Sequence, residues 1–209
     1  MTTVIFIRHG PTKENGEDRI QGHQHGQLLL RETEQYISAI TPLMRKYNPS
    51  VLLSSDLKRA EATCYMLKEF LQIEDVEGGV LELLRERSMG QYEGKLWKDI
   101  PQLLQNKRRK YIYDFRSYGG ESDEEVKKRV RTLLRYLAEK YTNECICCVT
   151  HAGWLQQLGQ VAREEGISPI DPDSWINRSA IYEASLDNGG CLQYLYSIPI
   201  EAKLPRDNG

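Results

Sequence analysis

The sequence lacks any apolar run long enough to cross a bilayer. Its 28 Lys and Arg residues nearly balance its 30 Asp and Glu residues, so no overall basic field favours nucleic acid or an anionic membrane as a partner. The chain has no internal repeat, linker or low-complexity segment, and its first predicted strand begins so early that we expect no signal or transit peptide. These absences favour a single domain over residues 1–209, with 40% hydrophobic residues to build its core.

Cysteine is limited to five residues, an odd number, at positions 64, 145, 147, 148 and 191. Three of them lie in Cys-Ile-Cys-Cys-Val, a run that is typical of a buried strand. Successive strand residues point to opposite faces, so these thiols cannot alone form a compact four-ligand site. We predict free cysteines packed as small hydrophobic side chains, with a zinc site as the second interpretation. Free cysteines favour a reducing compartment, the cytoplasm.

What the chain does have is an apolar run, Val4–Ile7, that leads directly into Arg8 and His9. Such a run predicts a buried strand, and ligands of α/β sheets bind in the loops at the carboxyl ends of strands. Arg8 offers a planar fork of donors for phosphate or carboxylate, and His9 offers a nitrogen nucleophile that is neutral near physiological pH. Arg-His-Gly alone equally fits an ordinary strand end, but the hydroxyl of Thr12 and the amide of Asn15 favour a binding loop.

A second histidine, His151, follows another predicted strand, Cys145–Val149. It repeats the arrangement of His9, and two such strand ends converge when the strands are neighbours in one sheet. A helix is predicted from Trp154, and a helix N-terminus favours an anion. The residues therefore predict two imidazoles beside an anion-binding site at one edge of a sheet.

Four motifs, in this order, resemble those of the histidine phosphatase superfamily, the phosphoglycerate-mutase-like group that transfers phosphoryl groups through a phosphohistidine. They are Arg-His-Gly-x-Thr-x-x-Asn from Arg8, Ser-x-Leu-x-Arg-Ala around Arg59, Leu-x-Glu-x-x-x-Gly-x-x-Glu-Gly around Glu86, and the strand that ends at His151. The resemblance covers nearly the whole chain. It departs at residues 25–30, where the family usually has an acidic residue and Pro-Leu-Thr, and at Ala152, where it usually has glycine; here Gly153 comes one position later.

The resemblance implies a fold and a set of site residues. The fold is an α/β three-layer αβα sandwich with a mostly parallel central sheet and a short helical cap inserted at residues 95–120. No metal and no other cofactor is implied. The implied catalytic residues are His9, Glu86, His151, Arg8 and Arg59. The implied substrate-binding residues are Thr12, Asn15, Gln21, Gly22 and Ala152, the last through its backbone N–H.

The implied function is hydrolysis of a phosphomonoester through a phosphohistidine on His9. A backbone carbonyl is expected to fix the tautomer of His9, and His151 is expected to be protonated and to stabilise the charge on the phosphoryl group. Glu86 would protonate the leaving oxygen and then take a proton from water. Because Glu86 must start protonated, we expect an acidic to neutral pH optimum.

Two other functions stay open. A cofactor-dependent phosphoglycerate mutase is second, because the predicted cap is short and the mutase arginine pair does not register on Arg108 and Arg109 without a gap. A non-catalytic module that binds a phosphorylated ligand or a protein is third, because the residues expected for catalysis are intact. The expected partner is a phosphorylated small molecule, with a phosphoprotein as the second choice; the sequence makes no prediction of oligomeric state.

Some polar residues have a second interpretation. Glu86 could be a surface carboxylate paired with Arg85 or Arg87, although its spacing to the following Gly and Glu-Gly favours the site. Two further groups are better explained as solvated: His23 and His25, which form only a weak candidate metal pair, and the basic run Lys107–Lys110.

Local patterns also predict individual helices. Apolar residues at helical spacing predict a helix over residues 31–45, which Pro42 should kink or break. The helix that carries Arg59 is expected to be capped by a residue of 54–56. Ser122 and Glu125 form a predicted capping box before another helix.

The remaining patterns predict strands and loops. Residues 80–84 are a strand candidate, and residues 96–118 are expected to be helical and irregular. An Asp-Asn-Gly-Gly turn between residues 178–186 and 191–197 predicts a hairpin. The tail from Ile198 is expected to be an exposed arm.

Overall fold

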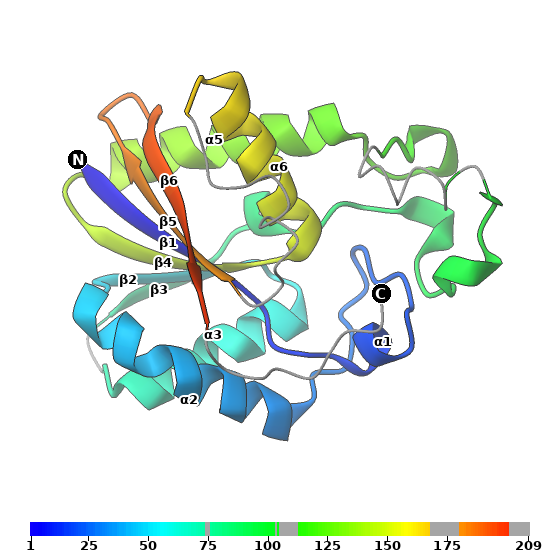
Figure 1. The fold of residues 1–209 in the computed structure, drawn as a ribbon, viewed down its shortest axis with the longest axis horizontal. Coiled ribbons are helices and arrows are strands. Elements are labelled where there is room, and N and C mark those ends of the chain that lie inside the picture. Colours follow the sequence, from blue (N-terminus) through cyan, green and yellow to red (C-terminus); the bar gives the residue numbers. More distant parts are fainter. Residues whose placement is uncertain (74–75, 103, 105–112, 168–179, 201–209) are drawn as a thin grey trace.

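A six-stranded sheet forms the centre of the computed structural model, which describes residues 1–73, 76–102, 104, 113–167 and 180–200. The strand order is β3-β2-β4-β1-β5-β6 (Figure 1). The first four strands in this order are parallel, and β5 and β6 are antiparallel, as the predicted mostly parallel sheet requires. The strands are β1 Thr2–Arg8, β2 Val51–Ser54, β3 Glu77–Val80, β4 Cys145–Thr150, β5 Ala180–Leu186 and β6 Leu192–Pro199.

Helices cover both faces of this sheet and complete the predicted three-layer sandwich (Figure 1). One face carries α5, Asp123–Lys140, and α6, Ala152–Glu164. The other carries α2, Leu30–Tyr47, and α3, Lys58–Leu71. Among the described residues, no helix is long and apolar enough to cross a membrane.

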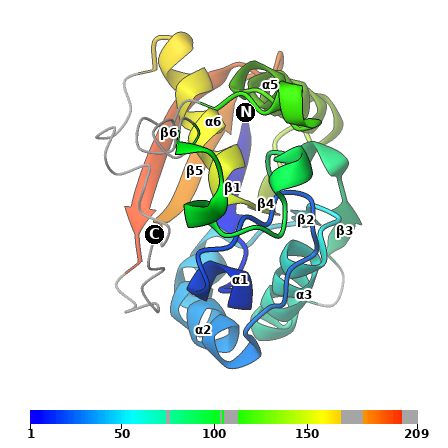
Figure 2. The same ribbon diagram turned by 90° about the vertical axis from the view of Figure 1, so that its right-hand side faces the viewer.

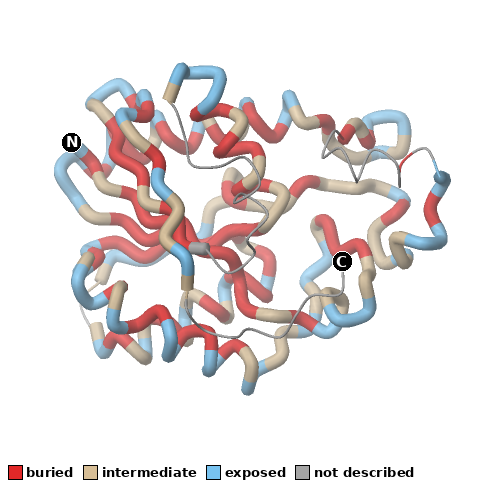
Figure 3. The backbone as a smooth tube through the Cα atoms, in the orientation of Figure 1, coloured by how far each residue is buried: buried red, intermediate tan, exposed pale blue. Residues whose placement is uncertain are grey.

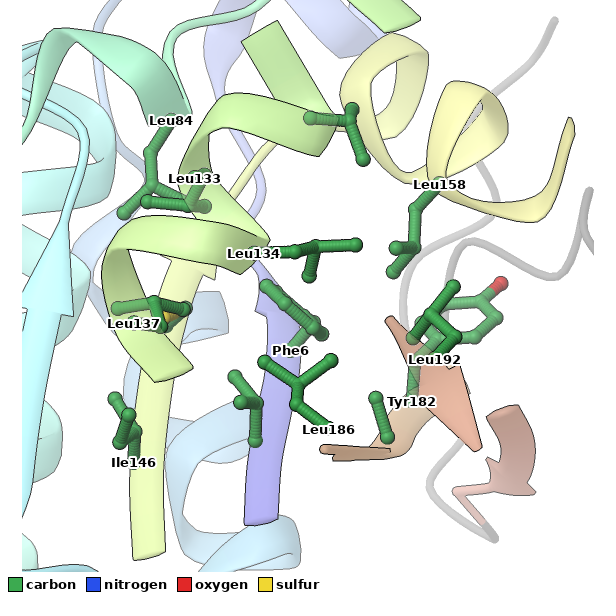
Figure 4. Close-up of a cluster of buried hydrophobic side chains, with 14 of the residues drawn as sticks. Phe6, Leu84, Leu133, Leu134, Leu137, Ile146, Leu158, Tyr182, Leu186 and Leu192 are labelled. Carbon is green, nitrogen blue, oxygen red and sulfur yellow. The ribbon is translucent and has the colours of Figure 1, made fainter. Parts of the chain in front are cut away.

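The two faces of β1 contribute to two separate apolar clusters. Val4 and Phe6 pack with α5 and α6, and Figure 4 shows Phe6 between Leu134 of α5 and Leu186 of β5. Ile5 and Ile7 pack on the opposite side with α2 and α3, as the alternation of strand side chains requires. The whole run from Val4 to Ile7 is therefore buried on both faces, which fixes the position of the loop that follows (Figure 3).

The cysteine prediction agrees with the structure. All five cysteines are free, and Cys147 and Cys148 of β4 are fully buried in the two clusters. Burial raises the pKa of both thiols well above the ordinary value, so they remain neutral packing groups.

Two helix predictions need correction. The helix α2 runs without a break through Pro42, because the proline lies on its exposed face, where water can solvate the carbonyl that lacks an N–H partner. The N-cap of α3 is Leu57, without a side-chain cap, rather than a residue of 54–56. The predicted capping box of Ser122 and Glu125 is confirmed at the start of α5.

The predicted strand over residues 80–84 is wrong. The edge strand β3 ends at Val80, and Glu82–Leu84 form a 3-10 turn. The Trp154 indole N–H donates to the carbonyl of Leu83 at 2.8 Å, and the Thr150 hydroxyl donates to the carbonyl of Leu84 at 2.8 Å. The carbonyls of Leu83 and Leu84 thus accept hydrogen bonds from side chains and not from the backbone of a neighbouring strand.

The predicted hairpin is confirmed in β5 and β6, whose turn is closed by the Asp187 carboxylate accepting from the Gly189 and Cys191 N–H groups. Residues 178 and 179 lie outside the described part of the chain. The exposed-arm prediction fails for Ile198 and Ile200, which pack against the α2–α3 cluster, and the rest of the tail is not described.

The segment that follows β3 lies beyond the carboxyl ends of the parallel strands, beside the short helix α1, Lys13–Gly16 (Figure 2). Its described residues contain short 3-10 turns at Gly90–Tyr92, Trp97–Asp99 and Arg116–Tyr118, and Gln102 and Leu104 are α-helical, which agrees with the predicted irregular helical segment. Together with Ile20 from the loop after α1, they form a third apolar cluster, which comprises Tyr92, Ile100, Leu104, Tyr113 and Phe115. The basic run 107–110 lies outside the described residues.

Candidate active site

The neighbouring strands β1 and β4 bring His9 and His151 together. Arg8 is paired in register with Thr150, and the His9 N–H donates to the Thr150 carbonyl at 2.9 Å. Both histidines therefore leave the sheet at the same level, and their ring centroids are 5.0 Å apart. The convergence expected from two separate strand ends is observed.

The hydrogen bonds of His9 assign its tautomer. Nδ1 lies 2.7 Å from the Gly10 carbonyl, which can only accept, so Nδ1 carries the proton. Nε2 accepts from Arg59 Nε at 3.2 Å, which requires a lone pair on Nε2. The Thr63 hydroxyl accepts from the Gly10 N–H at 3.0 Å and so holds Gly10, the residue whose carbonyl accepts from the ring.

The environment of His9 also keeps it neutral. Burial, followed by the positive charges of Arg59 and Arg8, lowers the pKa of His9 well below its ordinary value, although the bond to the Gly10 carbonyl acts in the opposite direction. His9 thus presents an uncharged Nε2 lone pair, which is the state that a nitrogen nucleophile needs.

Arg59 lies in the first turn of α3, as predicted, and is 1% exposed. Besides its bond to His9, it donates to the carbonyls of Gly22 at 2.9 Å, Gln24, and His25 at 3.4 Å. Burial lowers its pKa to about 10, so the guanidinium is still charged at neutral pH. Arg59 therefore holds the loop over residues 22–25 against the histidine.

Arg8 supplies a second buried guanidinium at the end of β1, with 9% of its surface exposed. Its charge lowers the pKa of both His9 and His151. Two buried guanidinium groups lie beside two neutral imidazoles, and both guanidinium charges act on the two rings. The centre is therefore suited to an anion.

His151 is fully buried, and its Nε2 lies 2.6 Å from the Ser55 hydroxyl. Its Nδ1 is buried and has no hydrogen-bond partner among the described residues. Burial, followed by the charge of Arg59, lowers the pKa of His151 well below its ordinary value. His151 is therefore neutral in the ligand-free protein. A bound phosphate dianion would raise this pKa, so the predicted protonation of His151 beside the phosphoryl group stays a prediction.

Thr12 and Asn15 form the capping box of α1. The Thr12 hydroxyl donates to Asn15 Oδ1 at 2.8 Å and accepts from the Asn15 N–H at 3.2 Å. Their polar groups thus bond to each other in the ligand-free protein, and their predicted contact with a phosphate stays a prediction.

Gln21 and Gly22 border the centre through different groups. The Gly22 carbonyl accepts from Arg59, and the Gly22 backbone adopts a φ of +50°, with the Glu93 carboxylate where a Cβ would lie. Gln21 Oε1 is buried without a hydrogen-bond partner among the described residues. Glycine is therefore required at position 22, while the predicted ligand contacts of both residues stay predictions.

Glu86 is joined to the first turn of α6. Its Oε2 accepts from the Gly153 N–H at 3.0 Å. Its Oε1 accepts from the N–H of the next residue, Arg87, at 2.7 Å. The neighbouring arginines pair elsewhere, Arg85 with Asp56 and Arg87 with Asp123. The alternative of a surface carboxylate paired with these arginines does not hold.

The segment that carries Glu86 is fixed by side chains that the sequence did not single out. Arg129 of α5 donates to the carbonyls of Leu83, Arg85 and Glu86 at 3.0–3.2 Å. The His23 ring bonds to the Glu86 carbonyl at 2.8 Å. Arg129 gave no signal in the sequence because it looks like any exposed cation of an amphipathic helix.

The histidines at positions 23 and 25 do not form a metal pair. The His23 ring bonds to the Glu86 carbonyl, whereas His25 Nδ1 lies 3.4 Å from the Lys58 N–H, so the two rings have different partners. Within the described part of the chain, no group of three or more His, Cys, Asp or Glu residues is arranged to hold a metal ion.

This fold and this centre define an α/β protein that buries two histidines and two arginines together at the carboxyl edge of its sheet. A family profile, the histidine phosphatase superfamily (branch 1), matches residues 4–192. The chain therefore belongs to the histidine phosphatase superfamily, and it is an enzyme of the phosphoglycerate-mutase-like type.

Individual relatives agree with this assignment. The chain is 29% identical over 171 residues, 76% of this chain and 67% of the relative, to a metal-independent phosphoserine phosphatase of Arabidopsis thaliana. It is 30% identical over 169 residues, 77% of this chain and 70% of the relative, to phosphoglycerate mutase-like protein 4 of the same plant. The fold resembles a mycobacterial glucosyl-3-phosphoglycerate phosphatase in complex with VO3, with a TM-score of 0.72, 21% identity, and coverage of 96% of this chain and 99% of that one.

Proposed function

We propose that this protein hydrolyses phosphomonoesters of small molecules through a phosphohistidine on His9, without a metal ion. The observation that carries the proposal is the lone pair on His9 Nε2, held by Arg59 at 3.2 Å in a centre with two buried guanidinium groups. Three relatives support it through their names: a metal-independent phosphoserine phosphatase, a glucosyl-3-phosphoglycerate phosphatase and a phosphatase of Bacillus subtilis.

In the first step, His9 Nε2 attacks phosphorus, the ester P–O bond breaks, and the leaving oxygen takes a proton from Glu86. Arg8 and Arg59 stabilise the charge on the phosphoryl oxygens, and the free Nδ1 of His151 and the Ala152 N–H at the start of α6 are further donors. Thr12, Asn15, Gln21 and Gly22 would shape the rest of the phosphate pocket.

In the second step, the Glu86 carboxylate takes a proton from water, and the oxygen attacks phosphorus. The P–N bond breaks, its electron pair returns to Nε2, and inorganic phosphate leaves. The lowered pKa of His9 keeps this nitrogen neutral, and therefore nucleophilic, at acidic pH, which supports an acidic to neutral optimum.

The direct test is to trap the intermediate. The protein is mixed with a labelled phosphomonoester and quenched, and acid-labile, base-stable phosphate on the chain is measured. We expect stoichiometric label that disappears in His9→Ala and persists in His25→Ala, a control at an exposed histidine. Turnover without such label would refute the phosphohistidine, and neither label nor turnover across a panel of phosphomonoesters would favour a non-catalytic phospholigand-binding module.

A phosphoglycerate mutase is the second candidate, and the likeness to a protein named phosphoglycerate mutase-like supports it. The assay offers phosphoglycerate and follows both free phosphate and isomer exchange. We expect release of free phosphate; exchange without release would reverse the order of the two candidates.

We also propose that residues 95–120 form a cap insertion in a single domain over residues 1–209, and that the protein works in the cytoplasm. The apolar cluster around Tyr92, Tyr113 and Phe115 supports the cap, because it is separate from the two clusters of the sheet. The free cysteines support the compartment.

A further inference from the structure

Gly153, the second residue of α6, has no side chain at a place where Glu86 needs the space. A Cβ built on Gly153 would lie 2.3 Å from Glu86 Oε1 and 3.1 Å from its Cδ, closer than van der Waals contact allows. At the same residue, the backbone N–H donates to Glu86 Oε2 at 3.0 Å. One residue thus provides both the space and the hydrogen bond for the carboxylate.

The backbone of Gly153 does not itself require glycine. It lies in a regular helix and is not among the described glycines with positive φ. Glycine inside a helix costs about 1 kcal/mol relative to alanine. Helix stability therefore favours alanine at this position. The observed glycine is explained by the Glu86 carboxylate, which occupies the space that a Cβ would need.

We propose that Gly153 is a positioning residue that fixes the Glu86 carboxylate over the first turn of α6. This inference rests on the proposed function, in which Glu86 donates the proton to the leaving oxygen. It also explains why glycine follows Ala152 in this chain: the residue that faces the carboxylate is 153, not 152.

A methyl group at position 153 would displace the carboxylate rather than the backbone. The clashing atoms are the far end of a flexible side chain, so the fold can accommodate them by a rotation of Glu86. The Glu86 backbone cannot follow, because Arg129 and His23 both hold its carbonyl. A misplacement of about 1 Å at a reacting group lowers the rate on the order of 10²-fold.

The effect of this displacement depends on the leaving group. An alkyl phosphate needs a proton on its leaving oxygen, whereas p-nitrophenyl phosphate releases a stable anion without one. Gly153→Ala should therefore lower kcat for an alkyl phosphomonoester on the order of 10²-fold, and should leave the phosphorylation burst with p-nitrophenyl phosphate within a few-fold of wild type. Because alanine favours a helix, the Tm should stay equal or rise.

The experiment compares the rate of the phosphorylation burst of wild type, Gly153→Ala, Glu86→Gln and the double variant on both substrates, because Glu86 serves both substrates alike in the second step. Thermal unfolding of each protein is measured as well. Gly16→Ala is the control, because its new methyl group enters open space. We expect Glu86→Gln to show the same substrate pattern as Gly153→Ala, and the double variant to lose little beyond Glu86→Gln, since the two residues act as one unit.

Each outcome separates the two ideas. If Glu86→Gln slows the phosphorylation burst of both substrates equally or of neither, the proton-donor role fails, and the proposed function fails at that residue. If Glu86→Gln shows the leaving-group pattern while Gly153→Ala matches wild type on both substrates, only the positioning role is overturned. Equal losses on both substrates with a lower Tm in Gly153→Ala would indicate a packing role and would also overturn it.

Discussion

The hydroxyl of Ser55 lies 2.6 Å from Nε2 of His151, and both residues are fully buried. Their strands, β2 and β4, are parallel neighbours, and the Ser55 N–H donates to the Val149 carbonyl at 3.1 Å. The Leu57 N–H donates to the same hydroxyl at 3.4 Å, which leaves the hydroxyl hydrogen for Nε2. In the neutral ring, the proton then lies on Nδ1, where it can be donated to a phosphoryl oxygen.

We therefore predict that Ser55→Ala weakens binding of phosphate and its analogues and lowers kcat/KM. The change removes the group that selects the tautomer and leaves a buried nitrogen unsatisfied, which costs about 1–3 kcal/mol, on the order of 10- to 100-fold. The measurements are steady-state kinetics with a vanadate titration, and 15N NMR of the histidine rings, which reports the tautomer directly.

Two further variants make the Ser55 prediction specific. Ser55→Thr keeps a hydroxyl and should recover most of the activity. Ser54→Ala changes the adjacent buried serine of β2 and should behave like wild type. The prediction fails if Ser55→Ala keeps the Nδ1–H tautomer and normal kinetics.

Arg59→Lys should nearly abolish activity although it keeps the positive charge. Arg59 donates at once to His9 Nε2 and to the carbonyls of Gly22 and Gln24, and an ammonium group cannot reproduce this planar fork. We expect kcat/KM to fall on the order of 10²- to 10³-fold, as for the loss of one preorganised donor to a developing charge. Lys58→Ala, at the exposed neighbour, is the control, and a mild effect of Arg59→Lys would show that charge alone suffices.

The strand ends and their histidines could be predicted because their signal is local. The run Val4–Ile7 needs burial on both faces, and the polar residues that follow must then lie at the sheet edge. The pairing of Arg8 with Thr150 is a long-range consequence of sheet order, yet it required only that β1 and β4 be neighbours.

Other parts of the site depend on contacts that leave no local pattern. The segment 80–84 has the apolar residues of a strand, but the Trp154 indole and the Thr150 hydroxyl take its carbonyls, and both come from the distant β4–α6 region. The tautomer role of Ser55 was hidden for the same reason: a serine after a strand also fits a helix cap. The neutral state of His151 in the ligand-free protein also has no local signal, because burial and the neighbouring guanidinium groups lower its pKa only in the folded protein.

The two buried histidines should make stability depend on pH in a defined window. Their pKa values are lowered in the folded protein, so below about pH 6.5, the ordinary histidine value, the unfolded chain binds more protons. Their contribution to stability is complete above this pH and decreases as the pH falls. Below about pH 6.5, each histidine should change the free energy of unfolding by up to about 1.4 kcal/mol per pH unit, and both together by up to about 2.7 kcal/mol per pH unit.

Urea unfolding of wild type and His9→Gln between about pH 7 and about pH 5 measures this slope. The slope of the variant should be smaller by up to about 1.4 kcal/mol per pH unit at the acidic end of this range, because one titrating group has been removed. His25→Gln, at an exposed site, should leave the slope unchanged. Parallel curves for wild type and His9→Gln would mean that His9 titrates alike in both states.

Pro42 should be a removable weakness of α2. It lies on the exposed face of a continuous helix, has no N–H for the Ser38 carbonyl, and is far along the helix from the loop that carries His9. Pro42→Ala restores one helical hydrogen bond, worth up to about 3 kcal/mol by helix propensity, less about 1 kcal/mol because alanine frees the unfolded chain. A net gain of about 2 kcal/mol should raise the Tm by roughly 4–8 °C at this chain length, with unchanged kinetics. Ser38→Ala, a neutral change on the same face, should move the Tm little. An unchanged or lower Tm in Pro42→Ala would contradict the prediction. It would show that the missing hydrogen bond to the Ser38 carbonyl does not destabilise α2.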